Sequence, residues 1–404
     1  MKRIILSVWL CALGGLSQAS TQPNIVFFFT DDQGYGDISA HGNPILKTPH
    51  LDRLRAESVR FEDFHVSPTC APTRAALFTG RHEFKNGITH TILERERLAP
   101  KAITLAQVLR DTGYTTGIFG KWHLGDEKEY LPSARGFDEM FIHGGGGIGQ
   151  VFPGSCGDAP GNKYFDPAIL HNGKFVKTSG YCTDVFYRQA TEWMDTQRRA
   201  GKPFFAYIPT NAPHSPYIAR PEDAALYEGK VATPQRAHFY GMIHNIDENI
   251  GRVLTKLGEW GIEEETLVIF MNDNGTAAGE TVFNAGMRGK KGSPWLGGTR
   301  AASFWRWPGT LTPRETRANV PASTAICKTS WCKGADAASR RGSCQRLSLI
   351  SLVGCSVGAL ASRRYSCWIN GSVRSMMGRS ADFACDATST YRQCSRSMAN
   401  AVGP

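Results

Sequence analysis

A cysteine stands directly before a predicted helix in the segment Cys70–Arg74, which reads Cys-Ala-Pro-Thr-Arg and continues as Ala-Ala-Leu-Phe-Thr-Gly-Arg. Pro72 suits the first turn of a helix, and Gly80 suits the residue that ends one. The sulfur, or a group that replaces it, would face backbone N–H groups and the positive end of the helix dipole. The segment therefore predicts a nucleophile beside an anion site for sulfate or phosphate. The plain alternative is an ordinary buried cysteine before a helix.

Polar clusters follow two predicted strands. The continuous apolar run Asn24–Thr30 is typical of a strand buried on both faces, and Asp31–Asp32 comes directly after it. Thr266–Met271 repeats the pattern and is followed by Asn272–Gly275, which reads Asn-Asp-Asn-Gly. Open parallel sheets bind ligands beyond the carboxyl ends of their strands, so we expect both clusters at one binding edge.

The acidic side chains of these clusters predict a cation site. If Asp31, Asp32 and Asp273 converge, each pair of carboxylates about 4 Å apart repels by about 4 kcal/mol at an effective dielectric constant of about 20. A cation must offset this repulsion. Oxygen ligands favour a hard ion, so Ca²⁺ is the first choice and Mg²⁺ the second. Either cluster alone would be typical of turn residues after a strand.

Helix-like and strand-like segments alternate between the two clusters. The further helices are expected at Thr48–Glu57, Thr104–Arg110 and Gln235–Trp260. The further strands are expected at Val59–Phe64, Thr115–Phe119 and Phe204–Ile208. This alternation predicts an α/β protein with a doubly wound, mostly parallel sheet flanked by helices. The Gly-rich segment 144–180 predicts an insertion at the rim of a pocket, and Cys156 and Cys182 could form a disulfide there.

The N-terminus is typical of a secretory signal peptide. Lys2 and Arg3 precede the apolar stretch Ile4–Leu16, and Ser17–Ala19 offers small residues for cleavage, which gives a signal peptide over residues 1–19. We therefore expect an exported protein, periplasmic or secreted. The apolar run is too short to span a membrane, and no later run has the required length.

The last part of the chain differs from the rest in composition. The net charge is +10, but residues 327–404 hold 11 Lys/Arg against 3 Asp and no Glu, which leaves only +2 for the remainder. Seven of the 11 cysteines also lie there. A disulfide-rich module is one interpretation. Because the apolar residues keep neither helical nor strand periodicity, we favour a reading-frame shift near Pro321, which divides the chain into a catalytic domain, 20–320, and an atypical tail, 321–404.

The basic tail is a weak argument for nucleic-acid binding. It carries no signature of a nucleic-acid-binding fold. With the tail set aside, the body of the chain is nearly neutral. We therefore expect no nucleic-acid partner.

Taken together, the motifs resemble those of the type I sulfatases, which have an alkaline phosphatase-like fold. That family's signature is Cys-x-Pro-Ser/Thr-Arg followed by x-x-Leu-x-Thr-Gly-Arg, and residues 70–81 match it, with Thr73 in place of the commoner serine. The resemblance covers residue 23 to about residue 318. It implies an arylsulfatase-like enzyme that cleaves the sulfate ester of a glycan or an aryl sulfate. It also implies that a maturation enzyme oxidises Cys70 to Cα-formylglycine, whose hydrate attacks sulfur with the help of Ca²⁺.

The resemblance also implies a role for each site residue. The metal ligands correspond to Asp31, Asp32, Cys70, Asp273 and Asn274. Arg74 matches the arginine that steadies formylglycine and the metal. Lys121 and His123, in Gly-Lys-Trp-His-Leu-Gly, match a sulfate-binding lysine and a histidine that contacts the formylglycine hydrate. His214, in Ala-Pro-His-Ser-Pro, matches the histidine that faces the leaving group, and Lys291 matches the second sulfate-binding lysine.

The chain departs from the family pattern in one loop and in its tail. Leu296 stands where the family often has Glu before Gly-Gly-Thr-Arg, which removes a salt-bridge partner and predicts a looser loop. The family's smaller C-terminal subdomain is absent or scrambled here. Two alternatives to a sulfatase therefore stay open: a phosphonate monoester or phosphodiester hydrolase of the same fold, and a catalytically impaired sulfate-binding protein.

Overall fold

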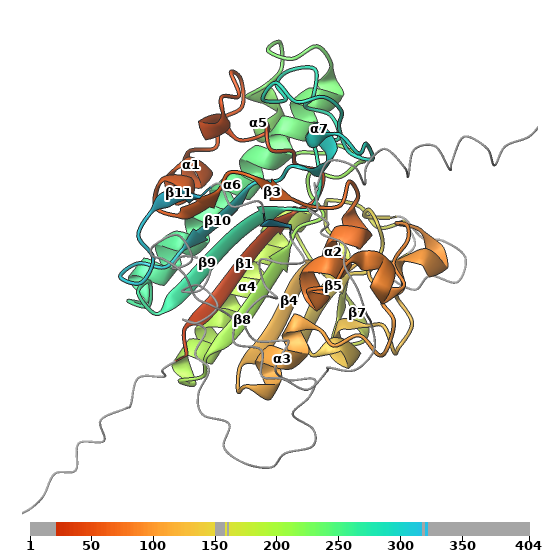
Figure 1. Ribbon diagram of the computed structural model, residues 1–404, viewed down its shortest axis with the longest axis vertical. Coiled ribbons are helices and arrows are strands. Elements are labelled where there is room, and N and C mark those ends of the chain that lie inside the picture. Colours follow the sequence, from red (N-terminus) through yellow and green to blue (C-terminus); the bar gives the residue numbers. More distant parts are fainter. Residues whose placement is uncertain (1–21, 150–157, 160, 317–319, 322–404) are drawn as a thin grey trace, which may run out of the picture. The chain divides into compact units, whose positions relative to one another are not determined.

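The computed structural model describes residues 22–149, 158–159, 161–316 and 320–321 (Figure 1). All of them belong to the first of the chain's two units, Met1–Val357. The predicted signal peptide, Cys156 and the predicted tail beyond Pro321 lie outside the described residues.

The centre of the fold is a ten-stranded sheet with the order β11-β2-β10-β9-β1-β8-β4-β5-β6-β7. Five neighbouring central strands run parallel: β9 (Thr266–Asn272), β1 (Asn24–Thr30), β8 (Phe204–Pro209), β4 (Thr115–Lys121) and β5 (Glu139–His143). Antiparallel pairs extend the sheet through β10 (Ser303–Arg306), β2 (Val59–Phe61), β6 (Ala168–His171) and β7 (Lys174–Lys177). The strand β11 (Arg314–Thr316) runs parallel to β2, and β3 (Phe64–His65) pairs separately with β12 (Val320–Pro321).

Helices cover both faces of this sheet (Figure 1). Along β1, Ile25, Phe27 and Phe29 pack in a core shared with the first face's helices, whereas Val26 and Phe28 pack in the opposite core. The first face carries α2 (Cys70–Thr79) and α3 (Leu105–Asp111). The opposite face carries α1 (Pro49–Ala56), α4 (Cys182–Arg199) and α6 (Pro234–Glu259). Burial on both faces explains why β1 reads as a continuous apolar run, and it confirms the predicted α/β class.

Short helices complete the described part of the chain. They are α5 (Pro221–Ala225), α7 (Leu296–Thr299) and 3-10 turns at Ser39–His41, Glu83–Asn86, Leu93–Glu96 and Pro132–Arg135. None of the described helices is long and apolar enough to cross a membrane.

Two local predictions need correction. The expected strand Val59–Phe64 is divided, because a turn at Glu62-Asp63 separates β2 from β3. The Gly-rich segment 144–180 is more than a rim, since part of it forms the β6–β7 hairpin at the edge of the main sheet. Asn172 and Gly173 connect these strands with positive φ angles of 47° and 88°, the conformation that tight hairpins favour.

Gly120 brings β4 and β8 together beside Lys121 and supports a stability prediction. A Cβ at Gly120, whose φ is +138°, would lie 1.9 Å from the Pro209 carbonyl oxygen. Gly201 also has a positive φ, but a Cβ there would meet no atom within 4 Å. We expect Gly120→Ala to lower the free energy of unfolding by about 1–3 kcal/mol more than Gly201→Ala, measured by denaturant unfolding. Equal losses in the two variants would contradict this packing argument.

Candidate active site

The predicted site residues meet at the carboxyl ends of the central strands. Asp31 and Asp32 follow β1, Asp273 and Asn274 follow β9, and Lys121 ends β4. Contacts with these residues also bring Cys70, Arg74, His123, His214 and Lys291 to this edge. Because the central strands are parallel, their carboxyl ends lie at one edge of the sheet, as the sequence pattern predicted.

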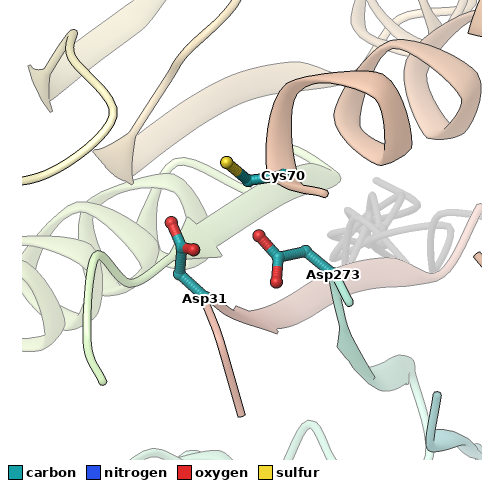
Figure 2. Close-up of side chains that lie close together, drawn as sticks. All are labelled: Asp31, Cys70 and Asp273. Atoms are coloured by element: carbon teal, nitrogen blue, oxygen red, sulfur yellow. The ribbon is translucent and has the colours of Figure 1, made fainter. Parts of the chain in front are cut away.

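Cys70 enters this edge from the start of α2. The helix begins at Cys70 after an extended Thr69 and ends at Gly80, whose φ of 62° lets its N–H bond to the Ala76 carbonyl at 2.9 Å. Every residue of α2 is buried. The Cys70 sulfur and a carboxylate oxygen of each of Asp31 and Asp273 lie within 4.8 Å of one another (Figure 2).

Arg74 and Lys121 supply buried positive charge next to Asp31. The Arg74 guanidinium donates to Asp31 Oδ2 at 3.2 Å, to Asp273 Oδ2 at 3.4 Å and to the Lys121 carbonyl at 3.1 Å. The Lys121 ammonium also contacts Asp31 Oδ2. Burial raises the pKa of Asp31, but these two cations, together with His214, outweigh burial and hold that pKa far below its ordinary value. Asp31 is therefore ionised.

Asp32 holds a second set of predicted residues. Its Oδ2 accepts a hydrogen bond from Lys291 Nζ at 2.7 Å and lies 3.7 Å from His214 Nε2. Its Oδ1 accepts from Asn274 Nδ2 at 3.0 Å. The backbone N–H of Asp32 donates to Asp273 Oδ1 at 3.0 Å, with a left-handed φ of 71° at Asp32. The two acidic clusters, separated by about 240 residues, thus bond directly to each other.

The oxygen atoms of this cluster fit a hard divalent cation. Asp31 Oδ1 and Asn274 Oδ1 are buried and accept no hydrogen bond, although buried oxygens ordinarily have a partner. Burial, and then the charge of Asp31, raise the pKa of Asp273 well above its ordinary value. Among the described residues, no group within hydrogen-bond reach partners these two oxygens, and a hard cation bound to them would supply the missing partner.

The Cys70 thiol and the His123 imidazole form an ionisable pair. Burial raises the pKa of Cys70, but the charges of Lys121 and His123 lower it to about 6. Burial lowers the pKa of His123, whereas Cys70 and a hydrogen bond to Glu96 raise it to about 9. His123 Nε2 lies 3.0 Å from Glu96 Oε2 and 2.8 Å from the Thr91 carbonyl oxygen. These contacts fix the ring orientation.

Glu96 was missed in the sequence analysis. It lies in a run of alternating Glu and Arg that is typical of a solvated surface, yet the structure buries it against His123. No local signal marks it, because its partner is 27 residues away.

Two neighbours of the site residues have partners of their own. Lys290, which precedes Lys291 in the chain, pairs with Glu280 at 2.9 Å instead of with Asp32. Cys182 is a free, buried thiol 3.7 Å from Asn211 Oδ1, whereas its suggested partner Cys156 lies outside the described residues.

The segment around Leu296 forms α7. The nearby arginines find partners other than a glutamate at this position. Arg288 stacks over Trp295, 4.0 Å from the ring centroid, and Arg300 donates to the Glu62 carbonyl at 2.6 Å.

A family model described as Sulfatase matches residues 23–326. The chain belongs to the sulfatase family. The chain is 34% identical over 298 residues to arylsulfatase J of Mus musculus, and the match covers 72% of the chain and 48% of that protein. It is 31% identical over 333 residues to N-acetylgalactosamine-6-sulfatase of Canis lupus familiaris, which covers 76% of the chain and 61% of that protein. The chain thus spans about half to three-fifths of the length of these curated relatives.

A solved structure has a fold similar to that of this chain. The crystal structure of Ps i-CgsB in complex with k-i-k-neocarrahexaose is 29% identical, with a TM-score of 0.66. The match covers 75% of this chain and 70% of that chain. This similarity supports the α/β fold described above.

Proposed function

We propose that this sulfatase hydrolyses a sulfate ester, with residue 70 in its formylglycine form as the nucleophile and a divalent cation, Ca²⁺ before Mg²⁺, in the oxygen cluster. The observation that carries the proposal is the convergence of Asp31, Cys70 and Asp273 from three remote segments. The unpartnered, buried oxygens of Asp31 and Asn274 support the cation.

The residues around position 70 suit this chemistry. Asp31, Asp32, Asp273 and Asn274 would hold the cation, which when bound activates an oxygen nucleophile and neutralises a sulfate oxygen. Lys121 and Lys291 would bind the sulfate group, and Arg74 holds the carboxylates in place.

Two histidines complete the proposed machinery. His214 lies at the Asp32 side of the cluster and would protonate the leaving oxygen. His123, oriented by Glu96, would hold a proton close to residue 70. Both roles rest on the match to the family motifs.

The substrate class, maturation and location belong to the same proposal. The names of the relatives favour a sulfated glycan or an aryl sulfate as substrate. A formylglycine-generating enzyme is the expected maturation partner, and the predicted signal peptide, 1–19, favours export to the periplasm or medium. We further propose that residues 20–320 are the catalytic domain and that a frameshift produced the tail, 321–404. Sequencing of the gene tests the frameshift. An uninterrupted reading frame that close relatives share would contradict it.

Parallel turnover assays test the reaction type. The full chain, produced together with a formylglycine-generating enzyme and supplied with Ca²⁺, is expected to hydrolyse aryl sulfate esters or sulfated sugars faster than phosphonate monoesters. A preference for the phosphonate would reverse the proposal. Binding of a sulfated sugar without turnover would favour an impaired binding protein.

The adjacent lysines 290 and 291 offer a matched pair of variants. Lys291 bonds to Asp32 at the site, whereas Lys290 pairs with Glu280 outside it. Because Lys291 is proposed to stabilise charge on the transferring sulfate, we expect Lys291→Ala to lower kcat/KM by about 10²–10³-fold. Lys290→Ala should change kcat/KM by less than about threefold, because substitutions of exposed residues usually have small effects. Equal losses in steady-state assays would contradict the assignment of Lys291.

A further inference from the structure

His143 is a buried polar side chain that the proposed mechanism does not use. It is the last residue of β5, its side chain is fully buried, and neither ring nitrogen has a hydrogen-bond partner. A buried polar group without a hydrogen-bond partner destabilises the folded state. A leucine or phenylalanine would fill the same space without this cost, so packing alone does not account for a histidine here.

The register of the sheet pairs His143 with Lys121. The strands β4 and β5 are parallel, and the Cα atoms of these two residues are partners. Two positions earlier in each strand, Phe119 and Phe141 pack in the same core. Since side chains alternate along a strand, Lys121 and His143 project toward that same face of the sheet.

The Lys121 ammonium needs an additional acceptor if a cation occupies the oxygen cluster. This ammonium contacts Asp31 Oδ2. Asp31 is also a proposed cation ligand, so a divalent ion at its unpartnered Oδ1 and Lys121 at its Oδ2 would share the charge of one carboxylate. An ammonium group carries three N–H donors and is costly to leave unpaired when buried.

We infer that His143 is a positioning residue, which accepts a hydrogen bond from the Lys121 ammonium and so frees Asp31 for the cation. The inference rests on the proposed function, because it requires a cation at Asp31. Burial, and then the charge of Lys121, hold the pKa of His143 well below its ordinary value. Its imidazole is therefore neutral and keeps one nitrogen able to accept a hydrogen bond. In this arrangement His143 helps to separate the cation-binding carboxylate from the sulfate-binding lysine.

A double-mutant cycle read out by Ca²⁺ affinity tests the coupling without any turnover. Calorimetric titration of the full chain with Ca²⁺ is expected to show about tenfold weaker binding for His143→Leu, since loss of an outer-shell partner typically weakens metal binding by about 10–100-fold. His143→Gln retains a hydrogen-bond acceptor, so its Kd for Ca²⁺ should stay within about threefold of the wild-type value. In the Lys121→Met background, His143→Leu should have no further effect. His171→Leu on β6, where His171 pairs with Glu139, is the control and should bind like wild type.

The outcomes separate this inference from the proposed function. Absence of Ca²⁺ binding to the wild-type chain would overturn both. Two results would overturn the role of His143 and leave the proposed function intact. One is wild-type Ca²⁺ affinity in His143→Leu, and the other is an equal loss of Ca²⁺ affinity on His143→Leu in the wild-type and Lys121→Met backgrounds.

A second measurement needs no substitution at position 143. In the ¹⁵N-histidine-labelled wild-type chain, a ring nitrogen of His143 should shift on addition of Ca²⁺, and in Lys121→Met it should not. An unchanged resonance in the wild-type chain would overturn the inference even if His143→Leu does not fold.

Discussion

Replacing Cys70 by alanine is expected to lower kcat for sulfate ester hydrolysis by at least about 10⁴-fold, because the variant has no side chain from which the nucleophile can be made. Alanine leaves the surrounding cluster intact, since Arg74 still bonds to Asp31, Asp273 and the Lys121 carbonyl. The fold should therefore persist. Circular dichroism and steady-state turnover of an aryl sulfate, measured on the same preparation, test both expectations.

Cys182 provides the matched control for this experiment. It is the other free, buried cysteine among the described residues, and it lies on α4 beside Asn211. Cys182→Ala should retain kcat within about threefold, as for a substitution that touches no reacting group. Comparable loss in both variants would indicate a general effect of core cysteines and would contradict a nucleophile at position 70.

Asp273→Asn is expected to abolish the stabilisation that Ca²⁺ gives to the wild-type chain. Ligand present at a hundredfold excess over its Kd stabilises a folded protein by about 2.7 kcal/mol. The asparagine keeps the shape and one oxygen but removes the charge, so the cation should bind far more weakly and activity should fall with it. Thermal melting with and without Ca²⁺ measures the loss.

The melting temperature of Asp273→Asn without added Ca²⁺ is a second expected result. A carboxyl group whose pKa is raised by folding destabilises the native state above its unfolded pKa, and burial beside Asp31 raises the pKa of Asp273. Without Ca²⁺, Asp273→Asn should therefore melt at or above the wild-type temperature at neutral pH. Asp111→Asn, at an exposed residue at the end of α3, should respond to Ca²⁺ as the wild type does. A variant at 273 that keeps the full Ca²⁺ response would contradict the proposed ligand set.

Strong local signals made much of the fold predictable. The bounds of β1 agree with the predicted run Asn24–Thr30, and β9 extends the second run by one residue. Both strands are buried on two faces, so nearly every position must be apolar. The start of α2 at Cys70 and its end at Gly80 were equally predictable, because terminal residues mark helices by their backbone conformation.

The β6–β7 hairpin and helix α4 also carry local sequence signals, although neither element was predicted. Asn172-Gly173 between β6 and β7 is a strong hairpin turn. In α4, the buried residues Cys182, Val185, Phe186, Ala190 and Trp193 recur at the spacing of one helix face.

The pairing of distant side chains could not be predicted from the sequence. The buried contact between Glu96 and His123 and the alignment of His143 with Lys121 both depend on how segments pack and on the register of the strands. Local periodicity carries no information on either. The meeting of the two acidic clusters was predictable from the parallel sheet. The places of Arg74, Lys121, His123, His214 and Lys291 beside them were expected only from the resemblance of their motifs to the sulfatase family.

The most direct test of the central claim is the chemical identity of residue 70. Trypsin should release the peptide 61–74 from the full chain, because no Lys or Arg lies between these positions. After production with a formylglycine-generating enzyme, mass spectrometry of this peptide should show an aldehyde in place of the thiol, in proportion to the sulfatase activity of the preparation. An active preparation in which residue 70 is entirely unmodified cysteine would contradict the account.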